Sequence, residues 1–362
     1  MQTVILLKAT RTTDPLGHRH ANARTINWAV LLLCALAASC AAALHLGTST
    51  LGSHASLSPE QLHTIIRTIR APRITLAVCV GAGLAVAGAV MQALVRNILA
   101  DPYIVGIHSG ASAGAAAVLL GGSALGAVGA AGAAGTASAA IPALGLQAGA
   151  FVGAAVASVL VFALARTAGS LNAVRILLAG VAVGYALSAL TSFMVFASDS
   201  PESSRSVMFW LLGSLNLARW DSALLACAVV TALCCAVLWC VGPHVDAVVV
   251  GDSTALSLGI RPARFRAVLL AVLCVLIGSL VAMSGAIGFV GLVVPHVARR
   301  LVGSAHRRML PIAALLGALL LVWSDVLARL LLAPQEIPIG IITALIGTPG
   351  LFILIRRQLS SP

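Results

Sequence analysis

ITLAVCVGAGLAVAGAVMQALV, residues 74–95, contains no charged residue and is bounded by Arg73 and Arg96. A membrane-spanning α-helix needs about 20 consecutive apolar residues to cross the hydrocarbon core of a bilayer. The stretch is long enough, and its many Gly and Ala residues are typical of helices whose backbones approach closely in lipid. It therefore predicts a transmembrane helix within a helical bundle.

Comparable apolar runs follow one another along the rest of the chain. Including the first, charged residues, Pro and Gly bound ten such runs, near residues 28–46, 74–95, 103–121, 147–165, 176–196, 221–241, 267–285, 287–301, 311–332 and 338–355. The eighth is short and contains Pro295, and the Gly- and Ala-rich residues 122–146 predict an exterior loop or a helix extension. We therefore expect an all-α membrane protein of about ten transmembrane helices.

The composition agrees with a membrane protein and argues against soluble classes. Hydrophobic residues make up 60% of the 362 residues and charged residues 9%, against about 25% charged residues in ordinary soluble domains. The net charge of +12 does not indicate nucleic-acid binding, because the arginines lie between apolar runs and not in a stripe with interleaved aromatic residues. The eight cysteines lie in apolar stretches without a CxxC pair, so we expect neither disulfides nor a metal site.

The first apolar run follows a basic leader. Ala37-Ala38-Ser39-Cys40 faintly resembles a lipoprotein cleavage site, so a cleaved signal peptide is one alternative. The length of the leader and the hydrophobic remainder of the chain favour a retained first helix. We accordingly expect a cytoplasmic tail over 1–27, one ten-helix domain over 28–357 and a cytoplasmic tail over 358–362.

The distribution of basic residues predicts the orientation in the membrane. If the amino terminus is cytoplasmic, the predicted spans leave outside only Arg67, Arg70, Arg73, Arg205, Arg219 and Arg329. Every other Lys and Arg falls on the cytoplasmic side, as the positive-inside rule requires. We therefore expect both termini in the cytoplasm.

The chain lacks residues that common energy-coupling chemistry needs. Lys8 is its only lysine, so it holds no GxxxxGK[ST] phosphate loop and cannot hydrolyse ATP by that route. In many carriers, acidic residues inside the membrane carry protons or ions. The acidic residues of this chain lie mostly in loops or at span ends. Asp325 is the exception, and Arg329 four residues later favours a structural ion pair. Energy is therefore expected from a partner protein.

Residues 242–266 form the largest predicted cytoplasmic connection. After Gly251, Asp252 and Ser253 can cap a short helix through Leu258, which Gly259 would end. Leu256 and Leu258 would give this helix an apolar surface outside the membrane. Such a surface indicates a docking partner, with a self-packed loop as the alternative.

A series of motifs resembles the permease family of ABC importers for ferric siderophores, haem and cobalamin. The motifs follow the family's order from about residue 60 onward: RAPR (70–73), GAGLAVAGAVMQ (81–92), RNILADP (96–102), ILLAG (176–180), WLLGS (210–214), GAIGFVGLVVPH (285–296), HRR (306–308), EIPIG (336–340) and TALIG (343–347). The resemblance implies a type II ABC importer permease in a bacterial inner membrane, with no catalytic residues and no cofactor or metal of its own.

The resemblance also implies partners. Family members pair with a second permease copy, usually as a homodimer with the translocation path between the subunits. Two ATPase subunits, which hold ATP and Mg, lie below, and a periplasmic substrate-binding protein docks above. Membrane lipid is the remaining partner, and no nucleic acid is expected.

Site residues follow from the resemblance position by position. Exterior arginines at Arg70, Arg73 and Arg329 would receive acidic groups of the binding protein, and guanidinium groups suit such bidentate pairing. An arginine that faces lipid headgroups or is paired within the chain is the alternative reading. The segment 251–261 would dock on the ATPase, with Asp252 where the family commonly has Glu. The cytoplasmic gate would comprise Asn97, Leu99, Asn172 and Ala173, although Ile98 stands where the family usually has Pro.

The cargo is less defined. We place Met91, Gln92 and His108 on the substrate path, and expect a haem or ferric siderophore ahead of cobalamin. His108 is a lone histidine on a packed helix, and such a histidine is more often structural than a haem ligand. Two other classes stay open: a membrane oxidoreductase with haem between paired histidines, and an ion-coupled carrier.

Overall fold

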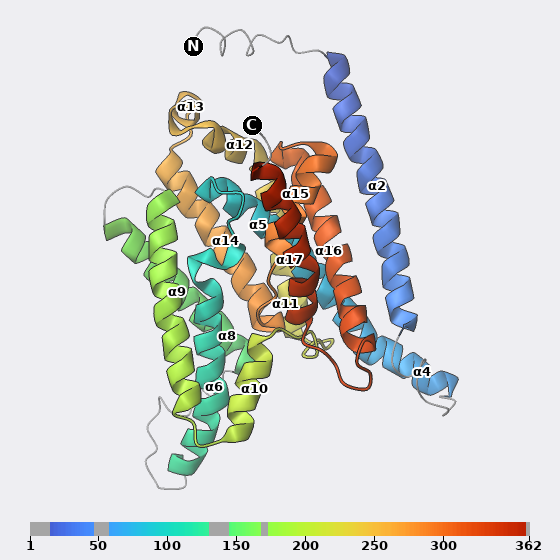
Figure 1. Cartoon of the computed structure of the whole chain (residues 1–362), viewed down its shortest axis with the longest axis vertical. Coiled ribbons are helices and arrows are strands. Elements are labelled where there is room, and N and C mark those ends of the chain that lie inside the picture. Colours follow the sequence, from blue (N-terminus) through green and yellow to red (C-terminus); the bar gives the residue numbers. More distant parts are fainter. Residues whose placement is uncertain (1–14, 47–57, 130–144, 168–172, 360–362) are drawn as a thin grey trace.

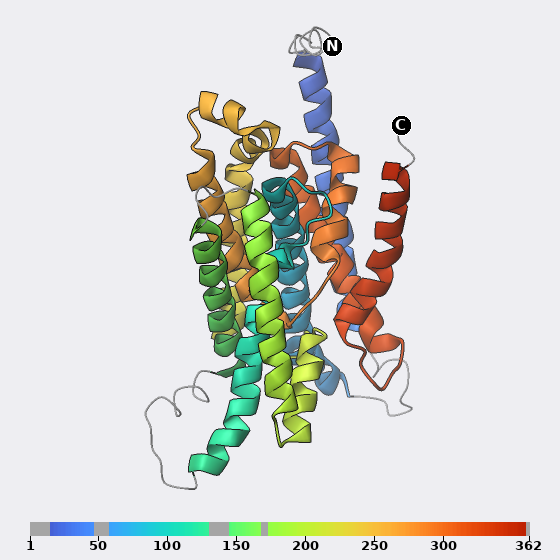
Figure 2. The ribbon, with the colours of Figure 1, turned by 60° about the vertical axis from the view of Figure 1, so that its left-hand side comes forward.

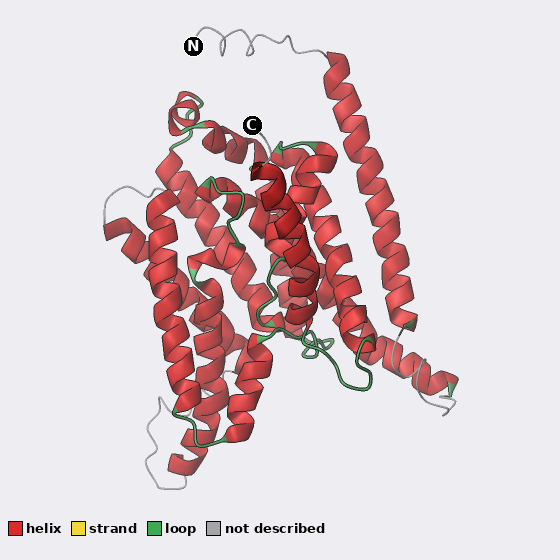
Figure 3. Cartoon of the chain, viewed as in Figure 1, coloured by secondary structure: helices red, strands yellow, loops and turns green. Residues whose placement is uncertain are grey.

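The computed structural model describes residues 15–46, 58–129, 145–167 and 173–359. In these ranges the chain forms helices joined by turns and loops, with no strand (Figure 3). The α-helices are α2 (Pro15–His45), α4 (Pro59–Ile65), α5 (Ala71–Val95), α6 (Ile107–Gly129), α8 (Gly145–Thr167), α9 (Ala173–Phe196), α10 (Pro201–Leu211), α11 (Ser222–Cys240), α12 (Gly242–Val250), α13 (Asp252–Ser257), α14 (Pro262–Ser284), α15 (Val290–Val302), α16 (His306–Leu330) and α17 (Ile339–Leu359). A π-helical turn (Ile66–Arg70) precedes α5, and a 3₁₀ turn (Pro102–Val105) precedes α6.

Each of the predicted spans corresponds to a helix, so the predicted all-α membrane fold is confirmed. Within the described ranges, seven helical stretches are long and apolar enough to cross a membrane: Asn22–His45, Glu60–Val95, Gly145–Arg166, Val174–Phe196, Ser222–Cys240, Pro262–Ser284 and His306–Leu330. Shorter apolar stretches, Ile107–Leu120 and Ile339–Phe352, belong to α6 and α17. The predicted eighth span is α15, which contains Pro295 and has 13 residues.

Helix α5, the stretch quoted first, lies at the centre of the bundle and is buried over most of its length. It packs against α16, α15, α14 and α11. A Cβ atom added at Gly81 would collide with the backbone of Gly317 on α16, and one at Gly88 would collide with Gly291 on α15. Glycine at these positions therefore permits backbone-to-backbone packing, as the small residues predicted.

Helix α15 begins inside the bundle, where a non-helical backbone needs hydrogen-bond partners. The turn before it contains Phe289, whose φ of 68° lies in the left-handed region. The hydroxyl of Tyr103 donates to the carbonyl oxygen of Ile287 at 3.1 Å and accepts from the Ile287 N–H at 3.2 Å. The amide of Ser214 also donates to the carbonyl of Ser284 at 2.8 Å. These contacts satisfy the interrupted backbone.

The two ends of the bundle differ. Figures 1 and 2 show the amino-terminal end of α2 and the carboxyl-terminal end of α17 at the end that also carries α12 and α13. Helices α4 and α10 lie toward the opposite end. Because the arginines that the sequence assigns to the cytoplasm lie with α12 and α13, we call this the cytoplasmic end and the opposite one the exterior end.

Several boundaries differ from the sequence expectation. Helix α2 begins at Pro15, inside the predicted tail, because the polar residues of its first turns leave no apolar signal in the sequence. Helix α14 begins at Pro262, inside the predicted connection 242–266. Helices α4, α10 and α12 are too short to give a membrane-length run, so a search for spans does not find them. Residues 130–144, part of the predicted loop 122–146, lie outside the described ranges.

Candidate functional site

The exterior end carries an ion-pair cluster built around Asp325 of α16. Its carboxylate accepts from Nε of Arg73 at 2.6 Å and from Nε of Arg329 at 3.0 Å. A second carboxylate, Glu336 in the connection after α16, accepts from Nη1 of Arg73 at 3.0 Å. The Asp325 side chain is 2% exposed, so the charge–charge attraction acts with little screening by water. The predicted Asp325–Arg329 ion pair is confirmed.

Two of the exterior arginines also hold the end of α2. Nη1 of Arg70 donates to the carbonyl oxygens of Leu44 at 2.8 Å and His45 at 3.1 Å. Nη1 of Arg329 donates to the carbonyl oxygen of Leu46 at 3.1 Å. The last carbonyls of a helix lack intrahelical partners and carry partial negative charge, so these contacts stabilise the helix terminus.

The structure thus brings together the three arginines expected to receive the binding protein. Arg70 and Arg329 are buried, and the side chain of Arg73 is 11% exposed. Their guanidinium groups are engaged by carboxylates and carbonyls of this same chain, which is the alternative reading of the sequence. Contact with a binding protein stays a prediction. The cluster holds three positive and two negative groups, so the cluster itself carries a net positive charge.

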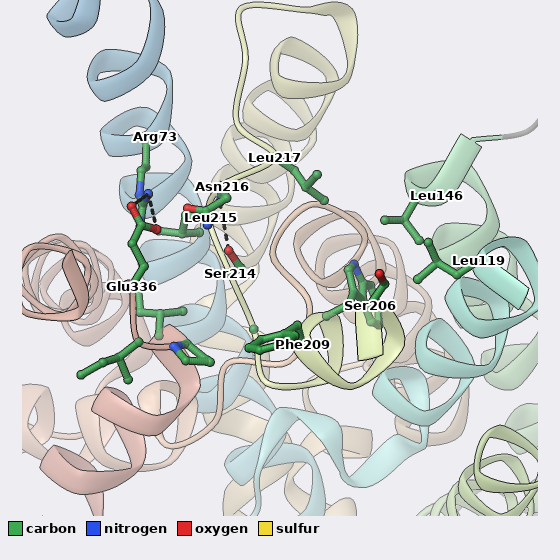
Figure 4. Close-up of a pocket in the computed structure, with 15 residues that line it drawn as sticks. Arg73, Leu119, Leu146, Ser206, Phe209, Ser214, Leu215, Asn216, Leu217 and Glu336 are labelled. Carbon is green, nitrogen blue, oxygen red and sulfur yellow. Dashed lines mark hydrogen bonds and ion pairs between the residues drawn. The ribbon is translucent and has the colours of Figure 1, made fainter. Parts of the chain in front are cut away.

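A cavity of about 470 Å³ opens beside the cluster (Figure 4). Arg73 and Glu336 lie on one side of it, and Leu119 and Leu146 lie on the other. The lining is mostly apolar and includes the buried Trp210, whose indole N–H has no partner in the described structure. Such a cavity, apolar with a few polar groups, is typical of a site that admits a ligand.

The loops around this cavity are fixed by backbone hydrogen bonds. The amide of Ile339 donates to the carbonyl of Gly213 at 3.1 Å, and that of Gly340 to Leu212 at 3.1 Å. These bonds join the connection after α10 to the start of α17. The motifs WLLGS and EIPIG, far apart in the sequence, therefore form one wall of the exterior cavity.

At the cytoplasmic end, Asp252 is the centre of a second network. Its carboxylate forms a bidentate contact with Arg266 at 2.6 and 3.0 Å and a further one with Arg96 at 2.8 Å. Arg96 also donates to the carbonyl oxygen of Val248 at 2.7 Å. Hydrogen bonds from Arg266, followed by the charges of Arg266 and Arg96, hold the pKa of Asp252 below its usual value. The carboxylate is therefore ionised at neutral pH.

This network corrects the predicted capping. Gly251 is the N-cap of α13 and Asp252 is its first residue, and the side chain of Asp252 binds arginines while no side chain caps the helix. The reason is that two guanidinium groups offer stronger, charge-assisted hydrogen bonds than backbone amides. The predicted stop is confirmed, since Gly259 adopts a left-handed φ of 78° directly after the helix.

The apolar surface predicted for this segment is confirmed. Leu256 is 59% exposed and Leu258 is 64% exposed, and both lie on α13 or directly after it. Helix α13 itself lies beyond the bundle at the cytoplasmic end (Figure 1). Two large apolar side chains in water favour a partner that covers them.

The predicted gate residues lie at this same end where they are described. Arg96 ends α5 in a left-handed conformation, and Asn97 and Leu99 follow in an exposed turn. The amide oxygen of Asn97 accepts from the Leu99 N–H at 2.9 Å. Ala173 is the first residue of α9, while Asn172 lies outside the described ranges. Gating by these residues stays a prediction.

The residues placed on the substrate path are largely internal. Met91 is fully buried. Gln92 is buried, accepts from Nη1 of Arg299 at 2.7 Å and donates to the Leu292 carbonyl at 3.1 Å. The His108 ring lies 5.3 Å from that of Tyr103, between ring centroids. Their role in a substrate path stays a prediction. The contacts described for Gln92 and His108 are with other residues of this same chain.

Several contacts of the cytoplasmic end give no signal in the sequence. The imidazole of His306 pairs with Asp246 at 2.5 Å, and the Arg299–Gln92 bond joins α15 to α5. The partners lie far apart in the chain, so no spacing rule identifies them. The one available hint was charge: Arg96 and Arg266 are basic residues expected on the same side of the membrane as Asp252.

Comparisons with known proteins agree with this geometry. The FecCD transport family matches residues 22–357. The chain is 40% identical over 300 residues to the cobalamin import system permease protein BtuC of Halobacterium salinarum, covering 83% of this chain and 75% of that protein. It is 38% identical over 334 residues to the hemin transport system permease protein HmuU of Yersinia pestis, covering 91% and 93%.

Further relatives extend the range of cargo. The chain is 38% identical over 303 residues to the Fe(3+)-citrate import system permease protein YfmD of Bacillus subtilis, with 83% of each chain covered. A solved structure described as an inward-facing conformation of a metal-chelate type ABC transporter matches with a TM-score of 0.78 and 31% identity, covering 91% of this chain and 98% of the other. The all-helical architecture is thus shared with a transporter of known structure.

Proposed function

The chain belongs to the FecCD transport family, and on this premise we propose that it moves an iron chelate, haem or a ferric siderophore, from the periplasm to the cytoplasm. It is a multi-pass membrane permease, and its relatives are permeases of import systems. The proposed membrane is the bacterial inner membrane. ATP hydrolysis would be carried out by a partner chain, with ATP and Mg held there.

The observation that carries the proposed division of labour is α13. Its exposed Leu256 and Leu258 form an apolar surface outside the bundle, and Asp252 binds Arg96 and Arg266 and so fixes the helix to α5 and α14. A force applied to α13 by an ATPase would therefore reach the turn that holds Asn97 and Leu99. Gly251 and Gly259 flank the docking helix. This arrangement supports an ATP-driven importer.

A second permease copy is proposed to face α9 and α17. Helix α9 exposes Tyr185, Ser188 and Ser192 together with Phe193. Hydroxyl groups are unfavourable against lipid tails, so their exposure supports a water-lined path between two subunits. Figure 2 shows α17 standing along the outside of the bundle, where a partner can reach it.

Docking of a periplasmic binding protein is proposed at the exterior end. Arg70, Arg73 and Arg329 together outnumber the two carboxylates of the cluster by one charge. This net positive charge supports electrostatic attraction of an acidic partner. Because Asp325 and Glu336 already bind two of these arginines, an incoming carboxylate must compete with them. Glu336 is the more exposed of the two competitors.

The cargo is tested by uptake. Cells with and without the gene are given labelled haem, a labelled ferric siderophore and labelled cobalamin in parallel. We expect loss of uptake of one iron chelate when the gene is deleted. Cobalamin is the second candidate, favoured by the 40% identity to a cobalamin permease. Unchanged uptake of all three compounds would contradict the proposed function.

A further inference from the structure

An apolar groove of about 340 Å³ runs between α8 and α14, away from both ends considered above. Phe151, Val159 and Phe162 line it from α8, and Leu270, Cys274 and Val275 line it from α14. The groove has no charged residue in its lining. Figures 1 and 2 show these two helices side by side on one flank of the bundle.

The two helices are antiparallel, and the residues along them show where the groove begins and ends. Toward the exterior ends of the two helices, a Cβ atom at Gly278 would lie 3.4 Å from the Ala154 methyl group and 3.6 Å from the Phe151 ring. From there the groove rises toward the cytoplasm along α8 to Phe162 and along α14 to Ala267. At 1.5 Å per residue, the rise is about 16 Å on each helix.

Each of the two helices carries one arginine just beyond the cytoplasmic end of the groove. Arg166 lies four residues beyond Phe162, on the same face of α8, with its guanidinium carbon 5.9 Å from the Phe162 ring centroid. Arg264 lies three residues before Ala267, on the same face of α14. Both side chains are exposed, and neither forms an ion pair with any part of the chain that the structure describes.

We propose that the groove and these two arginines form a binding site for an anionic phospholipid of the cytoplasmic leaflet. One acyl chain would occupy the groove and the phosphate would lie between Arg166 and Arg264. The groove suits a hydrocarbon chain, because its lining is apolar except for Ser158, whose hydroxyl donates to the Ala154 carbonyl oxygen at 2.7 Å. Guanidinium groups suit phosphate through paired hydrogen bonds. Basic residues at the cytoplasmic surface attract anionic lipids. The proposal depends on neither the cargo nor the ATPase, so it holds apart from the proposed function.

The head-group contact is tested by native mass spectrometry of the full chain in mild detergent. Phosphatidylglycerol and phosphatidylcholine with identical acyl chains are added in equal amounts. We expect preferential retention of phosphatidylglycerol, weakened about fivefold by Arg166→Gln or Arg264→Gln and about 25-fold by the double variant. The double variant Arg166→Lys with Arg264→Lys keeps the charge and should retain most of the preference.

Arg307→Gln is the matched control. Arg307 is another exposed cytoplasmic arginine over an aromatic ring, 6.0 Å from the centroid of Trp239. It lies on α16 and Trp239 on α11, and neither helix lines the groove. Its loss should leave lipid retention unchanged. Equal retention of the two lipids by the native chain, or an equal loss with Arg307→Gln, would overturn the proposal.

The acyl-chain contact needs a separate variant that keeps both arginines. Ala271 lines the groove and is exposed, so Ala271→Trp fills the groove without crowding the bundle interior. We expect this variant to lose phosphatidylglycerol while it elutes from a sizing column like the native chain. Full retention by Ala271→Trp would refute an acyl chain in the groove. Disulfide formation between copies through Val159→Cys would show that a second copy covers it, which would also overturn the proposal.

Discussion

At the exterior end, the carboxylate of Asp325 lies between the guanidinium groups of Arg73 and Arg329. Removing one member of a buried ion pair leaves its partner charged and unpaired, which typically costs about 3–5 kcal/mol. We predict that Asp325→Asn lowers the free energy of unfolding in detergent by about this amount. Denaturant unfolding followed by circular dichroism measures it.

Glu336→Gln is the control for that variant. Glu336 binds the same arginine, but its side chain is 38% exposed, so solvent screens the interaction. The expected cost is below about 1 kcal/mol. Equal destabilisation by both variants would show that burial of Asp325 is not the cause.

Asp252 gives a pH prediction. Its pKa in the folded chain is lowered, chiefly by hydrogen bonds from Arg266, so its contacts stabilise α13 above the ordinary aspartate pKa and are lost as the pH falls through the lowered value. Hydrogen exchange of α13 should therefore change little from pH 8 to pH 5 beyond the intrinsic rate. Asp252→Asn should increase exchange of α13 at neutral pH, and Asp252→Glu should increase it less. Protection unchanged in Asp252→Asn would contradict this role.

The sequence identifies residue contacts only where spacing reveals them. Asp325 and Arg329 are four residues apart on one helix, so their ion pair was predictable. The Arg73–Glu336 and Arg96–Asp252 pairs join residues from separate parts of the chain, and charge alone does not select a partner. For the same reason, the sequence placed Arg70 and Arg73 in a docking surface without showing that both are engaged within the chain.

At the scale of the element, α13 tests the coupling proposal. We predict that Leu256→Asp combined with Leu258→Asp reduces copurification of the ATPase partner at least tenfold, because charged groups cannot enter an apolar docking pocket without loss of solvation. The thermal stability of the isolated permease should not change, since both side chains are exposed.

Leu331→Asp combined with Leu332→Asp is the control. Both leucines are exposed directly after α16, at the opposite, exterior end of the bundle. This variant should leave copurification of the ATPase unchanged. If the α13 variant binds the ATPase as well as the native chain does, the apolar surface of α13 is not the docking site.

The packing of α5 gives a second prediction at this scale. Gly81→Ala places a methyl group against the backbone of Gly317, so α5 and α16 must separate. The expected destabilisation is about 1–3 kcal/mol, measured by thermal unfolding in detergent. Gly288→Ala is the control, because nothing lies within 4 Å of its added Cβ. Similar unfolding of the two variants would contradict close helix packing at Gly81.

Membrane-length helices were predictable because each leaves a long apolar run in the sequence. The short helices α10 and α12 were not predictable, because neither is long enough to cross the hydrocarbon core of a membrane. Their formation depends on local caps such as Ser200 at the start of α10. The interrupted start of α15 was visible only as a short run with Pro295. The contact of Tyr103 with Ile287, which satisfies the backbone there, is tertiary and gives no signal in the sequence.

For the whole molecule, sequence and structure agree that both described chain ends lie at the same end of the bundle. That this end faces the cytoplasm stays a prediction from the unequal distribution of basic residues between loops, whereas the family was predictable because its motifs extend through the bundle. The substrate path stays a prediction, because Met91 and Gln92, which the sequence places on it, are buried inside a single chain. A path between two permease copies is also lined by residues of both copies, so the sequence of one chain does not define it.

The most direct test of the central claim is uptake into proteoliposomes that contain this chain, its ATPase and its binding protein loaded with a labelled iron chelate. We predict uptake that requires ATP on the cytoplasmic face and persists when an ionophore dissipates the proton gradient. Uptake that proceeds without the ATPase chain and collapses with the proton gradient would contradict the account and identify an ion-coupled carrier.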